Sequence, residues 1–128
     1  IIYDPQESIS LQGNSGPYLQ YSHARAKSIL AKSSIMHYEF VDLTVHERLL
    51  AGSLVDFNYV INKATEEFSP HLICTYLYEL AQTFNRFYEN SKVIGDPREA
   101  LRIELVRRYA ETLKTGLTLL GINAPDKM

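Results

Sequence analysis

One cysteine and no tryptophan occur among the 128 residues. Cys74 has no second cysteine for an internal disulfide, and no CxxC pair or mixed Cys and His array offers a structural zinc site. These absences exclude a disulfide-stabilised secreted domain and argue against a zinc-dependent fold, and they fit a reducing cytoplasmic compartment. We expect Cys74 to be a buried, inert thiol, because it falls in an apolar stretch.

Long apolar runs and catalytic motifs are also missing. No apolar stretch approaches the roughly 20 residues that cross a bilayer, and Ile1–Glu7 carries acids where a signal peptide carries bases. The sequence contains no phosphate loop and no GxGxxG, HExxH or GxSxG motif. We therefore expect no membrane partner, and no catalytic residue, cofactor site or metal ligand in this chain. The start at Ile1, without an initiator methionine, leads us to expect part of a longer protein.

The histidines are scattered along the chain. No two of them are four residues apart, the spacing that places two metal ligands on one helix face. We expect each to be a surface or capping residue: His23, His37, His46 and His71. The acidic groups Glu66–Glu67 and Asp96–Glu99 fall where helices are predicted to end and to start, and acids have ordinary roles there.

An excess of positive charge is absent, since the formal net charge is -2. This argues against a protein that binds nucleic acid through bulk charge. The charge is uneven, however, because Ser8–Tyr38 contains no Asp or Glu while Arg25, Lys27 and Lys32 give it +3. Charge alone leaves two interpretations open: a solvated helix face that happens to lack acids, or a local surface for an anionic partner.

Four helices are predicted from the spacing of apolar residues and from their start and stop signals. The first runs from Pro17 to about Ser34, and the second starts at the capping box of Thr44 and Glu47. The apolar face of the second helix comprises Leu50, Leu54, Phe57, Ile61, Ala64 and Phe68. Ser69–Pro70 starts a third helix that ends before Gly95, and Asp96–Pro97 starts a fourth that ends at Gly121. We expect an all-α, antiparallel bundle of about four main helices, with 1–15 as an irregular lead-in and 16–128 as the helical domain.

Aromatic residues are mostly tyrosines, nine in all. Tyr18, Tyr21 and Arg25 are three and four residues apart, so on a helix they fall within about 60° of one another. Two phenol rings and a guanidinium on one face are typical of a surface that stacks unpaired RNA bases. The alternative is that both rings are half-buried edges of the core with their hydroxyls in water.

A long segment containing these residues resembles a known family. Gly13–Arg25 reads GNSGPYLQYSHAR and closely resembles the G-x-S/T-G-P-Y-L-Q-Y-x-H-A/S-R segment of arginyl-tRNA synthetases, where the catalytic core passes into the anticodon-binding domain. Tyr76–Ala81 with Phe84–Tyr88, and Gly116–Ile122 followed by Pro125 and Met128, are similar to later blocks of that family. Glu99–Arg102 reads EALR and differs by one letter from the DALR sequence that names the domain class.

The resemblance implies a carboxyl-terminal, DALR-type anticodon-binding domain. It implies that the first segment contacts the anticodon loop, that the third helix faces the same bases, and that the final methionine lies close to them. The residues that take these roles are Tyr18, Tyr21 and Arg25, then Asn85 and Tyr88, and Met128.

In this family the parent enzyme is a class I ligase that joins arginine to its tRNA using ATP with magnesium. The ligase motifs are absent here, so the resemblance implies a chain that is inactive by itself. Its expected partners are an arginine-accepting tRNA and the catalytic domain of the same chain, with neither membrane nor DNA. A rival interpretation is a non-enzymatic helical bundle in which Tyr18 and Tyr21 anchor a protein–protein interface.

Overall fold

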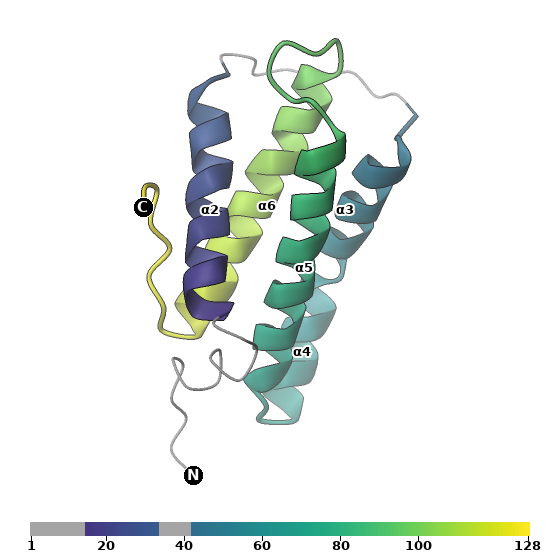
Figure 1. Ribbon diagram of the computed structural model, residues 1–128. Coiled ribbons are helices and arrows are strands. Elements are labelled where there is room, and N and C mark those ends of the chain that lie inside the picture. The colour runs from purple at the N-terminus through teal and green to yellow at the C-terminus, as the bar shows by residue number, and fades with distance from the viewer. Residues whose placement is uncertain (1–14, 34–41) are drawn as a thin grey trace.

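The computed structural model describes residues 15–33 and 42–128. Residues 1–14 of the expected lead-in, and the expected first-helix end at Ser34, lie outside these ranges. The described residues form five α-helices and no β-strand, which confirms the all-α prediction. The helices are α2 (Ser15–Ala31), α3 (Val45–Val55), α4 (Phe57–Glu66), α5 (His71–Asn90) and α6 (Glu99–Leu119) (Figure 1).

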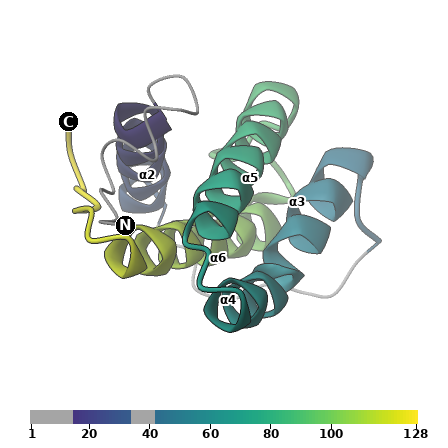
Figure 2. The ribbon, with the colours of Figure 1, turned by 90° about the horizontal axis from the view of Figure 1, so that it is seen from below.

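The helices lie in an antiparallel arrangement. The chain rises through α2, descends through α3 and α4, rises through α5 and descends through α6 (Figure 1). α2 and α3 both pack against α5 and α6, and they lie on opposite sides of this central pair (Figure 2). The segment after α6, residues 122–128, runs beside α2 on the side away from α3 and α4 (Figure 1). We call this segment the tail.

The predicted capping box starts α3. The Glu47 backbone N–H donates to Thr44 Oγ1 over 3.3 Å, and the Thr44 backbone N–H donates to Glu47 Oε1 over 2.9 Å. The same carboxylate accepts from Arg98 Nη2 at 2.5 Å and from Arg102 Nε at 2.8 Å, with no part of the Glu47 side chain exposed. One glutamate therefore joins the start of α3 to the start of α6.

The prediction of one continuous second helix is wrong, because its hydrogen-bond ladder is interrupted at Asp56. The Tyr76 hydroxyl of α5 donates to the Ser53 carbonyl over 2.7 Å. The Asp56 backbone N–H also donates to this carbonyl, over 3.3 Å. In an uninterrupted helix that carbonyl would accept from Phe57, so a side chain from another helix accounts for the break between α3 and α4.

Phe68 is the one member of the predicted apolar face that the structure places in solvent. It is 93% exposed and has a φ of +50°, because α4 ends at Glu66 and the chain turns there. The turn is closed by the Ser69 N–H donating to the Ala64 carbonyl at 2.9 Å and the Phe68 N–H donating to the Thr65 carbonyl at 3.3 Å. This is a Schellman motif with phenylalanine at the position that glycine usually occupies.

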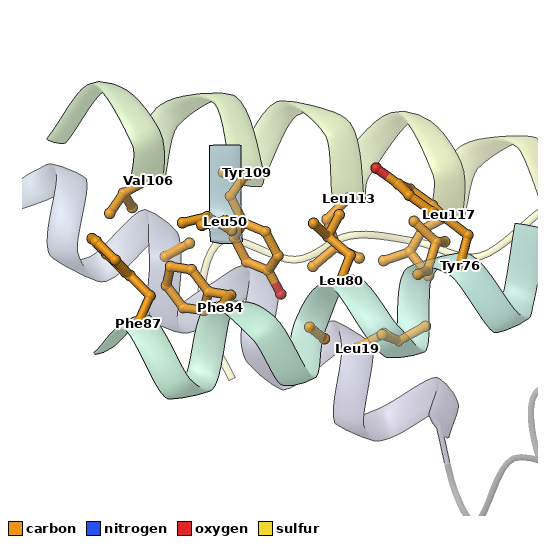
Figure 3. Close-up of a cluster of buried hydrophobic side chains, with 14 of the residues drawn as sticks. Leu19, Leu50, Tyr76, Leu80, Phe84, Phe87, Val106, Tyr109, Leu113 and Leu117 are labelled. Atoms are coloured by element: carbon orange, nitrogen blue, oxygen red, sulfur yellow. The ribbon is translucent and has the colours of Figure 1, made fainter. Parts of the chain in front are cut away.

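The core lies between α5 and α6 and is closed by α2 and α3 (Figure 3). Tyr109 stacks on Phe84, with ring centroids 4.0 Å apart and planes 1° apart. The Tyr109 hydroxyl lies 2.5 Å from Ser22 Oγ, so the buried phenol has a hydrogen-bond partner on α2. Cys74 is 1% exposed, which confirms its predicted burial.

Candidate nucleic-acid interface

Side chains from α2, α5 and the tail surround an open groove of about 490 Å³. We call it the α2–tail groove. Four of the six residues expected to contact the anticodon line it, namely Tyr21, Arg25, Tyr88 and Met128. The other lining residues are Ala24, Ser28, Ile29, Lys32, Asp126 and Lys127.

Arg25 lies between two tyrosine rings. Its guanidinium carbon is 5.6 Å from the ring centroid of Tyr21 and 5.1 Å from that of Tyr88, within cation–π range of both. Tyr21 is 55% exposed and Tyr88 is 43% exposed, so both rings keep accessible surface. The groove thus combines two aromatic surfaces with a fixed positive charge, which suits an unstacked base and its phosphate.

Tyr18 and Asn85 support this arrangement without lining the groove. The Asn85 side chain donates to the Tyr18 hydroxyl over 2.6 Å and accepts from Arg25 Nη1 over 3.5 Å. The Tyr18 ring is half-buried, with its centroid 5.5 Å from that of Tyr78. Burial of the hydroxyl, together with the nearby Tyr78, raises the pKa of Tyr18 above its ordinary value. Tyr21 therefore fits the exposed-platform interpretation. The half-buried ring of Tyr18 fits the core-edge alternative, but its hydroxyl bonds to Asn85 and does not point into water.

The tail is held against α2 by two hydrogen bonds. Gln20 Nε2 donates to the Asn123 carbonyl over 3.0 Å, and His23 Nδ1 lies 2.7 Å from the Pro125 carbonyl. His23 is 1% exposed, so its expected surface or capping role is wrong. The tail covers this side of α2, and helical spacing cannot reveal such a contact. Of the other histidines, His71 is exposed, His46 is partly exposed and His37 lies outside the described residues.

The charges of the groove come from both sides of it. Of the basic residues in the acid-free stretch, Arg25 and Lys32 line the groove and Lys27 does not. Lys127 contributes a further cation and Asp126 an acid, and sequence reasoning missed both. No periodic pattern marks the tail, so the family resemblance at Met128 was the one available signal for it.

The described part of the chain offers other surfaces with different chemistry. A larger groove of about 810 Å³ lies between α3, α4 and α6, and Phe57 is its one aromatic lining residue among those described. Within residues 15–33 and 42–128, no three His, Cys, Asp or Glu side chains gather into a possible metal site. No helix in these ranges has the length and apolar character needed to cross a membrane. A third groove, of about 410 Å³ beside α4 and α5, also has two rings and a cation, from Tyr59, Tyr76 and Lys63, but two acids line it as well, Asp56 and Glu79. The α2–tail groove differs in its excess of cations over acids and in an arginine held between two rings.

Residues 19–128 match the sequence pattern of the DALR anticodon binding domain. The chain belongs to this family. The DALR domain is 42% identical over 136 residues to an arginine–tRNA ligase of Thermus thermophilus, covering 96% of this chain and 22% of the ligase. It is 38% identical over 135 residues to the arginine–tRNA ligase of Pasteurella multocida, covering 99% of this chain and 24% of the ligase.

Solved structures agree with this assignment. The arginyl-tRNA synthetase of Thermus thermophilus superposes with a TM-score of 0.82 at 41% identity, over 91% of this chain and 21% of that one. A putative arginyl-tRNA synthetase of Campylobacter jejuni superposes with a TM-score of 0.80 at 31% identity, over 87% of this chain and 26% of that one. The DALR domain therefore corresponds to about a quarter of the length of these relatives.

Proposed function

We propose that this DALR domain binds the anticodon loop of an arginine-accepting tRNA as part of an arginine–tRNA ligase. The observation that carries the proposal is the position of Arg25 between the exposed rings of Tyr21 and Tyr88 in the α2–tail groove. The arginine–tRNA ligase names of the relatives supply the identity of the RNA and of the parent enzyme.

In the proposed mechanism, bases turned out of the anticodon loop stack on Tyr21 and Tyr88. Each stacked base contributes roughly 1–3 kcal/mol to binding. The Arg25 guanidinium binds a phosphate while the Tyr18–Asn85 pair fixes its position, and Lys32 adds positive charge at the edge of the groove. The exposed thioether of Met128 offers an apolar contact to a base.

The chemistry of ligation belongs to the rest of the parent enzyme in this proposal. A catalytic domain of the same chain uses ATP with magnesium to activate arginine, and the enzyme acts in the cytoplasm. The 128 residues of the sequence contain neither a phosphate loop nor a GxGxxG motif. We therefore expect the DALR domain alone to bind tRNA weakly and not to aminoacylate it.

Replacing Tyr21 with alanine in the full-length ligase tests the groove. Loss of one stacking surface is expected to raise KM for tRNA by about tenfold or more, with KM for ATP and arginine unchanged. Tyr59→Ala is a matched control, because Tyr59 is 67% exposed and lies beside Lys63 on α4, across the bundle from the tail. Steady-state aminoacylation kinetics measure both. Equal changes in KM for tRNA in the two variants would contradict the proposal.

A change in the RNA separates anticodon recognition from the rival protein–protein interface. Filter binding compares a cognate tRNA with the same tRNA altered in its anticodon. We expect the altered tRNA to bind at least about tenfold more weakly to the wild type, and the difference to shrink in Tyr21→Ala. Equal affinity of the wild type for both RNAs would favour the rival.

A further inference from the structure

Two polar residues of α2, Gln20 and His23, do not line the α2–tail groove. Both instead contact backbone carbonyls of the tail, at Asn123 and Pro125. His23 does so from a position that is 1% exposed. Gln20 and His23 belong to the segment that resembles arginyl-tRNA synthetases, and neither takes part in the proposed RNA contacts. Their hydrogen bonds to the tail give both residues a structural role.

The tail has little else to fix its course. Ile122 is 4% exposed and anchors its beginning in the core, and Ala124 packs against the core. Pro125 has no backbone N–H to donate, so its carbonyl is its one backbone hydrogen-bonding group. Beyond it, the side chains of Asp126, Lys127 and Met128 reach the groove, all from exposed positions. Among the hydrogen bonds of residues 15–33 and 42–128, the bond from His23 is thus the last one along the tail before the residues that form the groove wall.

The two bonds also set the register of the tail. From Gln20 to His23 the helix rises about 4.5 Å, and from Asn123 to Pro125 an extended chain spans at most about 7 Å. Both segments run in the same direction (Figure 1). With the carbonyls of Asn123 and Pro125 bound in turn, a shift of the tail along α2 breaks both hydrogen bonds and moves Lys127 and Met128 relative to Arg25.

We propose that Gln20 and His23 are positioning residues for RNA binding, which hold the tail so that Lys127 and Met128 complete the wall of the α2–tail groove. The inference rests on the proposed function of that groove. Neither residue contacts the RNA, and both act through the tail. A carbonyl oxygen can only accept a hydrogen bond, so His23 donates from Nδ1. An asparagine side chain places a donor at a similar distance from the backbone, whereas alanine has none.

The test is a double-mutant cycle in the full-length ligase, with tRNA affinity as the readout. His23→Ala is expected to weaken binding of an arginine-accepting tRNA about fivefold to tenfold, as for the loss of one hydrogen bond. Deletion of residues 126–128 is expected to weaken it about tenfold or more. In the deleted protein, His23→Ala is expected to change affinity by less than about twofold, because the groove wall is already gone. An equal effect of His23→Ala with and without residues 126–128 would overturn the inference.

Two further variants distinguish a loss of tail positioning from a general folding defect. His23→Asn is expected to stay within about twofold of the wild type, and Gln20→Ala to show the same dependence on residues 126–128 as His23→Ala. Gln20 is only partly buried, so its replacement tests the inference even if His23→Ala does not fold. Failure of His23→Asn to restore binding, or a Gln20→Ala effect independent of the tail, counts against the positioning role.

Backbone mobility provides a readout without RNA. The amide ¹⁵N order parameters of residues 126–128 are expected to fall clearly in His23→Ala relative to the wild type, while those of α5 and α6 stay unchanged. Unchanged order parameters in residues 126–128 would overturn the inference. If the tail deletion leaves affinity unchanged while Tyr21→Ala weakens it, the inference fails and the proposed function stands. If neither change weakens binding, the proposed function fails.

Discussion

At the scale of single residues, Phe68 combines two unfavourable features. Its φ of +50° lies in the left-handed region, and 93% of its surface is exposed to water. A side chain in that region is less stable than glycine, by about 1 kcal/mol. The exposed ring offsets little of this, because it has few contacts to lose.

Phe68→Gly is therefore expected to be more stable than Phe68→Ala, by about 1 kcal/mol in the free energy of unfolding. Alanine removes the ring and keeps the unfavourable φ, so the comparison isolates the backbone conformation. Urea unfolding of the two variants and the wild type measures the difference. Equal stability of the glycine and alanine variants would mean that the turn after α4 differs from the Schellman motif described above.

At the scale of whole helices, two glycines have opposite surroundings. Gly52 lies on the exposed side of α3, and a Cβ atom placed there would contact nothing within 4 Å. Gly116 is buried in α6, and a Cβ atom there would lie 2.7 Å from Leu77 Cδ2 and 2.8 Å from Leu77 Cδ1 of α5. Leu77 is fully buried, so it has little room to move. The close approach of α5 and α6 depends on the missing side chain.

Alanine at these two positions is expected to change stability in opposite directions. Gly52→Ala should raise the free energy of unfolding by about 0.5–1 kcal/mol through helix propensity alone. Gly116→Ala should lower it by about 1–2 kcal/mol, because overpacking against Leu77 outweighs the same propensity gain. Thermal or denaturant unfolding distinguishes the two. A stabilised Gly116→Ala variant would show that Leu77 can rearrange freely.

At the scale of the whole molecule, Glu47 links stability to pH. Burial of its carboxylate opposes ionisation, but hydrogen bonds from Arg98, the Thr44 backbone and Arg102 outweigh this and lower the pKa of Glu47 from 4.5 to about 2. The folded protein therefore binds this proton less readily than the unfolded chain. The contribution of Glu47 is present above about pH 4.5 and is lost as the pH falls from there toward 2.

Glu47→Gln is expected to flatten that part of the pH profile. It removes the titrating group while keeping an oxygen for the capping box, and it leaves Arg98 and Arg102 without their anion. We expect a loss of about 2–3 kcal/mol near neutral pH that shrinks as the pH falls toward about 2. Glu104→Gln is the control, because Glu104 pairs with the more exposed Arg107 and Arg108. Equal pH profiles for wild type and Glu47→Gln would contradict the assignment.

Local signals predicted the helical architecture well and long-range contacts poorly. The capping box at Thr44 lies within four residues of sequence, so it can be recognised without a structure. The break at Asp56 depends on Tyr76 from another helix, and the burial of His23 depends on the tail. The spacing of apolar residues along one helix therefore cannot predict either feature. Spacing placed Tyr21 and Arg25 on one face correctly. It could not show that Tyr88 would meet them, since that contact crosses from α2 to α5.

The contact between His23 and Pro125 joins positions 102 apart in the chain. During translation, α2 leaves the ribosome long before the residues that complete its neighbouring surface. A nascent chain therefore has no finished groove until synthesis has passed Lys127, and long-range closure of this kind is slow relative to helix formation. We expect ribosome-bound intermediates that lack the tail to contain folded helices and yet to bind the proposed tRNA at least about tenfold more weakly than the finished protein.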